Sequence, residues 1–154
     1  TDAEGRLILA DALTYTQRTF KPAALIDMAT LTGGVIVALG HARAGILSND
    51  EALCKALIAA GESTYERLWQ LPLDEEYNDL IKSHEADMKN SGGREASTIM
   101  GGIFLKQFIE EDTRWAHLDI AGTGDIAKDG PYCPAGPTGF GIRLLIDYLK
   151  QMKM

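Results

Sequence analysis

Short apolar runs alternate along the chain with longer segments in which apolar residues recur at helical spacing. The short runs are typical of buried strands and lie at residues 24–29, 43–47, 68–71 and 115–121. The longer segments predict helices at residues 7–15, 35–39, 51–60, 99–109 and 141–152, with a weaker helix at 75–81. Strands and helices that alternate in this way predict an α/β fold.

Turn-forming and capping residues mark where these elements stop. Gly40, Gly61 and Pro72 each follow an apolar segment, and we expect an element to end at each of them. Ser97 or Thr98 is expected to cap the helix that follows. Residues 122–138 are rich in glycine and proline and predict a long loop.

Composition narrows the class of protein. The 154 residues suffice for one core, and no apolar run approaches the roughly 20 residues that span a bilayer, so a membrane partner is not expected. The net charge is −7 and the basic residues are scattered, which argues against nucleic acid as a partner. Cys54 and Cys133 lie far apart and lack metal-ligand spacing, so free thiols and a cytoplasmic location are expected.

The first residues carry the most suggestive chemistry. Asp2, Glu4 and Arg6 alternate at spacing two, and in an extended segment all three would face the same way. Two neighbouring carboxylates repel unless a cation such as Mn²⁺, Mg²⁺ or Zn²⁺ lies between them, and the arginine could hold an oxyanion. A plainer interpretation also stands, in which the two carboxylates cap the following helix and Arg6 is a solvated surface charge.

Residues 1–13 resemble the signature of the leucine aminopeptidase (cytosol aminopeptidase) family, above all in the run Thr-Asp-Ala-Glu-Gly-Arg-Leu at residues 1–7. Further matching blocks follow in the family's order at residues 29–34, 38–40, 69–73, 86–87, 115–122 and 138–141. The resemblance covers essentially the whole chain. It implies a three-layer α/β/α architecture around a mixed, largely parallel sheet, with residues 1–154 forming the C-terminal portion of a catalytic domain.

The resemblance also implies roles at the metal site. Asp2 would bind one of two adjacent divalent ions, Mn or Zn and possibly Mg, and Glu4 would bridge both. Arg6 would hold a bicarbonate ion that relays a proton. The implied activity is release of N-terminal amino acids, with a leucine-type preference, from peptides that have a free N-terminus.

For the substrate, the resemblance implies that Thr30, Leu31 and Gly33 lie on a binding loop, with Leu31 acting through its backbone. Ala121 and Gly124 would line the pocket for the first side chain. Small residues after a strand also serve packing, so an ordinary structural role is the alternative for these positions.

The family's remaining metal ligands, a lysine and two aspartates, and a second catalytic lysine precede its signature. Because the chain begins at Thr1, without a signal peptide, we expect it to lack the upstream part of the domain and to be inactive alone. The resemblance implies a homohexamer for the complete protein. A non-catalytic α/β scaffold or assembly subunit derived from the family is the alternative function.

Two other patterns point elsewhere only weakly. Residues 122–127 fit a dinucleotide-binding pattern, but Lys-Asp-Gly-Pro follows where that motif requires a helix. His117 and Asp119 share a strand face, yet no serine elbow accompanies them, so His117 is expected to be a core histidine.

Overall fold

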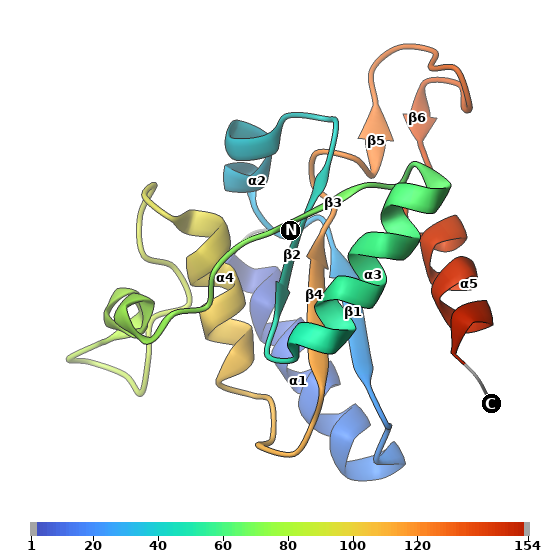
Figure 1. The fold of residues 1–154 in the computed structure, drawn as a ribbon. Helices are drawn as coiled ribbons and strands as arrows, with labels where there is room; N and C mark the ends of the chain where they lie inside the picture. The colour runs from blue at the N-terminus through green and yellow to red at the C-terminus, as the bar shows by residue number, and fades with distance from the viewer. Residues whose placement is uncertain (1–2, 153–154) are drawn as a thin grey trace.

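A four-stranded mixed sheet forms the centre of the molecule (Figure 1). The structure is a computed structural model that describes residues 3–152. The strands lie in the order β1 (Leu25–Ala29), β4 (Trp115–Asp119), β2 (Ala44–Ser48) and β3 (Leu68–Gln70). The β1–β4 and β2–β3 pairs are parallel, whereas β2 runs antiparallel to β4. The expected mixed, largely parallel sheet is therefore confirmed.

Helices cover both faces of this sheet (Figure 1). On one face, Ala116 and Leu118 of β4 pack with residues of α3 (Glu51–Thr64) and α5 (Ile142–Gln151). On the other, Trp115 packs with α1 (Ala3–Phe20) and α4 (Ser97–Lys106). Because successive strand residues point to opposite faces, β4 contributes to both cores. The three-layer α/β/α prediction is confirmed.

The shorter elements also follow the predicted pattern. The loop after β1 leads into α2 (Gly33–Leu39), which ends at Gly40 with a φ of 62° as expected of a glycine stop. Residues Glu75–Ile81 form the 3-10 helix η1. Within the predicted long loop, β5 (Asp125–Ile126) and β6 (Gly136–Pro137) pair as a small antiparallel ladder.

Several helix ends differ from the predictions. Helix α1 begins at Ala3, earlier than expected, so Glu4 is already helical. Helix α3 continues through Gly61, where a stop was predicted, and the absence of a Cβ on Gly61 lets the carbonyl of Glu66 approach the helix. Helix α4 has no side-chain cap, since its first hydrogen-bonded turn starts from Ala96 in a left-handed conformation with φ of 48°.

Two further predictions concerned membrane-spanning helices and the state of the two cysteines. No helix within residues 3–152 is long and apolar enough to cross a membrane. Cys54 and Cys133 are both free thiols, as predicted, and burial raises the pKa of Cys54 to about 11.

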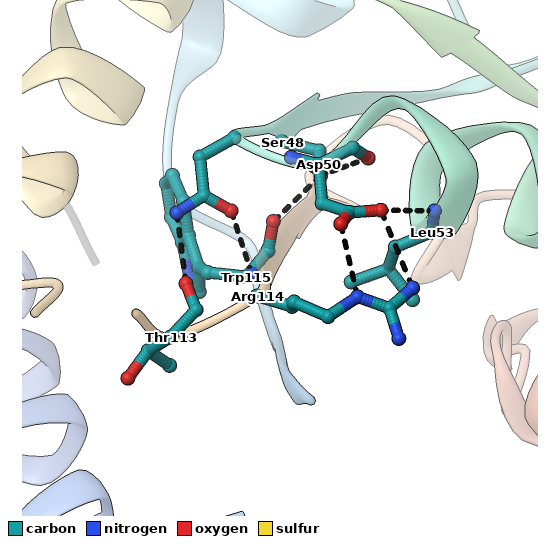
Figure 2. Close-up of polar contacts among 7 residues, drawn as sticks. Ser48, Asp50, Leu53, Thr113, Arg114 and Trp115 are labelled. Atoms are coloured by element: carbon teal, nitrogen blue, oxygen red, sulfur yellow. Dashed lines mark hydrogen bonds and ion pairs between the residues drawn. The ribbon is translucent and has the colours of Figure 1, made fainter. Parts of the chain in front are cut away.

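A polar cluster at the end of β2 joins α3 to the start of β4 (Figure 2). The carboxylate of Asp50 caps α3 by accepting a hydrogen bond from the N–H of Leu53 at 2.6 Å. The same carboxylate accepts hydrogen bonds from Arg114, the residue before β4, at 2.9 and 3.3 Å. These hydrogen bonds from Arg114 and Leu53 lower the pKa of Asp50 below its ordinary value.

Asp50 is therefore expected to stabilise the fold in a pH-dependent way. Replacing it with alanine should cost about 1 kcal/mol at pH 7, chiefly through loss of the cap. Replacement with asparagine keeps a capping oxygen and should cost less. Because the folded-state pKa is lowered, the carboxylate's contribution is complete above its unfolded pKa of about 3.9 and is lost as the pH falls through the lower folded value.

Urea unfolding of wild type, Asp50→Ala and Asp50→Asn at pH 7 and pH 3 measures this effect. The difference between wild type and Asp50→Asn should shrink at pH 3. A difference that is unchanged or larger at pH 3 contradicts the assignment.

Candidate functional site

A buried carboxylate connects the loop after β1 to the end of β4. The two strands are parallel neighbours, so their carboxyl ends share one edge of the sheet, where ligands of α/β proteins commonly bind. Asp119, the last residue of β4, is fully buried. Its Oδ1 accepts hydrogen bonds from the backbone N–H groups of Leu31 at 3.1 Å, Thr32 at 3.4 Å and Ala121 at 3.2 Å. Its Oδ2 accepts a hydrogen bond from the Thr32 hydroxyl at 2.6 Å.

The residues predicted to contact substrate meet at this edge. A Cβ atom placed on Gly124 would lie 3.5 Å from Cγ2 of Thr30 and 3.1 Å from the carbonyl oxygen of Ile120. The N–H of Gly124 also donates to Ile120 at 2.8 Å, which folds the chain back after β4. The structure thus brings Gly124 beside Thr30, and Asp119 links Ala121 to the same loop.

Arg6 reaches the other side of this loop from α1. Its side chain is 3% exposed, and Nη1 donates to the carbonyl oxygen of Asn90 at 2.5 Å. Gly101 of α4 allows this approach, because a Cβ there would lie 3.3 Å from Leu31 and Thr32 and 3.5 Å from Nε of Arg6. The plainer interpretation, in which Arg6 is a solvated surface charge, is therefore wrong.

A cavity of about 370 Å³ adjoins the buried guanidinium. Arg6 and Gly33 line it together, as does Arg94 from the irregular segment before α4. Gly33 is exposed, and a Cβ on it would meet no atom within 4 Å. Two arginines on one cavity give it a positive potential that suits a small anion.

The predicted common face of the three N-terminal residues is wrong for the two that can be placed. Glu4 and Arg6 lie on α1, where residues two apart point in nearly opposite directions, and Glu4 is exposed while Arg6 is buried. Asp2 lies outside the described residues. Within residues 3–152, no group of three or more His, Cys, Asp or Glu side chains could hold a metal ion.

A second cavity, of about 510 Å³, lies beyond the chain reversal after β4, where Thr123 lines it. None of the predicted site residues lines this cavity.

His117, predicted to be a core residue, is fully buried and pairs through Nδ1 with Asp27 at 2.6 Å. Its Nε2 has no hydrogen-bond partner among the described residues.

Sequence reasoning missed the anchoring role of Asp119 and the place of Arg94. For Asp119, the sequence pattern suggested only that it shares a strand face with His117. A usable signal was present, since an acidic residue ends an otherwise apolar strand and precedes a small-residue loop. Arg94 gave no such signal, because it lies in a polar stretch without periodicity.

Comparison with known proteins places these features in a family. The profile described as cytosol aminopeptidase family, catalytic domain, matches residues 1–146. A probable cytosol aminopeptidase of Geobacter sp. (strain M21) is 59% identical over 151 residues, which cover 98% of this chain and 30% of that protein. One from Protochlamydia amoebophila is 50% identical over 154 residues, covering all of this chain and 31% of that protein.

Solved structures agree with the sequence matches. A tomato leucine aminopeptidase mutant superposes with a TM-score of 0.86 at 39% identity, covering 96% of this chain and 28% of that one. The bottromycin maturation enzyme BotP in complex with Mn superposes with a TM-score of 0.88 at 36% identity, covering 96% and 33%. The chain thus spans about a third or less of the length of these proteins. With its fold and nearly its full length matched, the chain belongs to the cytosol aminopeptidase family.

Proposed function

We propose that the complete protein containing this chain is a metal-dependent aminopeptidase, which releases N-terminal residues from peptides with a leucine-type preference. The observation that carries this proposal is the convergence of the loop of Thr30 and Leu31, the residues after β4, and the buried guanidinium of Arg6 at one sheet edge. Family membership supports the same activity, since relatives of this chain are named cytosol aminopeptidases.

The cavity beside Arg6 fits the proposed bicarbonate. A planar monoanion with three oxygens can accept hydrogen bonds from a guanidinium, and Arg6 and Arg94 line the same cavity of about 370 Å³. In this proposal, Arg6 holds the anion in a fixed orientation from which it can pass a proton.

The proposed metals require ligands from more of the protein. Glu4 is exposed at the start of α1 and can offer a carboxylate, while Asp2 is the second candidate on this chain. The BotP structure with Mn supports a divalent ion of that kind, although Zn and Mg suit such oxygen ligands as well. When bound, two such ions would polarise the scissile carbonyl and activate water.

The proposed substrate contacts come from the two loops at the sheet edge. Thr30, Leu31 and Gly33 would hold the peptide backbone, with Leu31 acting through its main chain. Ala121 and Gly124 would border the first side chain, and the missing Cβ of Gly124 leaves space beside Thr30. We further propose a homohexamer in the cytoplasm for the complete protein.

A pair of assays tests the function. The 154-residue chain with Mn²⁺ should not hydrolyse leucine p-nitroanilide above the buffer rate, because its described residues supply no group of three metal ligands. The complete protein should hydrolyse it in a metal-dependent manner, with activity lost on chelation and restored by Mn²⁺.

The two negative outcomes have different meanings. Turnover by the isolated chain at the rate of the complete protein contradicts the predicted inactivity. A complete, metal-loaded protein that releases no N-terminal residue from any peptide would instead favour a non-catalytic scaffold.

A further inference from the structure

We propose that Asp119 is a positioning residue that fixes the orientation of the substrate-binding loop, an inference that rests on the proposed function. Asp119 is fully buried on the central strand β4 and accepts four hydrogen bonds, three of them from backbone N–H groups. One side chain therefore holds both loops of the site.

The direction of the hydrogen bonds at Thr32 extends this anchor to α4. The Thr32 hydroxyl has one proton, and it donates that proton to Oδ2 of Asp119. Thr98 of α4 lies 2.9 Å from the same hydroxyl and must then be the donor in that contact. The N–H of Val35 also donates to Thr32, which caps α2. A directed chain of hydrogen bonds thus runs from α4 through Thr32 to Asp119.

The geometry of the peptide bond links the hydrogen bonds of Asp119 to the direction of the carbonyl groups in the loop. In a trans peptide the N–H and the C=O point in opposite directions. Because the N–H groups of Leu31 and Thr32 point to Asp119, the carbonyls of Thr30 and Leu31 are directed away from it. Asp119 therefore determines which way the loop presents the backbone acceptors that the proposed function assigns to substrate.

Asp27 provides a matched control on the neighbouring strand. It lies in β1, is 10% exposed at its side chain, and accepts hydrogen bonds from Trp115 at 2.7 Å and His117 at 2.6 Å. These donors are side chains of β4, not backbone groups of the loop. Replacing the carboxylate of Asp27 should therefore disturb the packing between β1 and β4 without releasing the loop of Leu31 and Thr32.

The test compares Asp119→Asn and Asp27→Asn in the complete metal-loaded protein. Asp119→Asn should lower kcat/KM for leucine p-nitroanilide about tenfold to a hundredfold, mainly by raising KM, with metal content unchanged. Amide hydrogen exchange at Leu31, Thr32 and Ala121 should become about tenfold faster or more. Asp27→Asn should leave both quantities close to wild type. Equal effects of the two variants, or unchanged exchange in Asp119→Asn, would overturn the inference.

Thr32 offers a second route if Asp119→Asn does not fold. Thr32→Val keeps the side-chain shape and removes the hydroxyl that reaches Oδ2, so it should reproduce the loss, and Thr32→Ser should restore function. Wild-type behaviour of Thr32→Val would count against the inference. A wild-type protein without aminopeptidase activity contradicts the proposed function, whereas the exchange measurement still decides whether Asp119 orders the loop.

Discussion

Replacing Arg6 with methionine in the complete protein is expected to lower kcat/KM for leucine p-nitroanilide by about a hundredfold or more. Methionine keeps an unbranched side chain as far as the position of Nε and removes the guanidinium that lines the cavity beside Gly33. The proposed anion then loses its main donor, and the proton relay loses its orientation. Steady-state kinetics with and without added bicarbonate measures this, because the variant should no longer respond to bicarbonate.

Arg18 is the matched control on the same helix. It lies near the end of α1, its side chain is 72% exposed, and it pairs with Glu110 at 3.2 Å. Arg18→Met should therefore leave the kinetics unchanged, since exposed ion pairs contribute little. An Arg6→Met enzyme with wild-type kcat/KM and an intact bicarbonate response would refute the assigned role.

Trp115→Ala is expected to cost about 3–5 kcal/mol of unfolding free energy. The indole is fully buried between the sheet and its helices, and its Nε1 donates to Asp27 at 2.7 Å. Truncation would leave a large void and remove one donor from the largely buried carboxylate of Asp27. Trp115→Phe helps to separate the two effects, because it retains much of the volume while removing the N–H. Urea unfolding of both variants provides the measurement.

The other tryptophan serves as the control. Trp69 on β3 is 56% exposed, and its ring lies 5.8 Å from the guanidinium carbon of Arg43. Trp69→Ala should cost less than about 1 kcal/mol, the scale of an exposed cation–π contact. Similar losses for the two alanine variants would contradict the described packing.

Local patterns predicted the elements but not how they meet. The apolar runs around Ile26 and Leu118 identified β1 and β4 as strands, because apolar runs are typical of strands whose faces are covered by helices. The pattern could not establish that these strands are parallel neighbours. That pairing depends on packing between segments about 90 residues apart, and it alone places the loop of Thr30 next to Ala121.

The N-terminal residues show that spacing along the sequence does not by itself determine which side chains share a face. Resemblance selected Glu4 and Arg6 as site residues, but spacing two suggested a common face only for extended chain. Helix formation from Ala3 onward places them on opposite sides, so Arg6 enters the core while Glu4 remains exposed. From the sequence, Thr98 could be recognised only as a possible helix cap. Its hydroxyl instead contacts Thr32, which lies in a distant segment of the chain.

The cavity beside Arg6 has two walls of different character. Gly33 follows directly from the loop that Asp119 holds, whereas residues 91–94 are exposed and belong to a stretch, 82–96, that is neither helix nor strand. The first wall has already lost its conformational entropy when the protein folds. If binding an anion orders either wall further, we therefore expect the entropic cost to fall on residues 91–94 and to lower the affinity of the cavity.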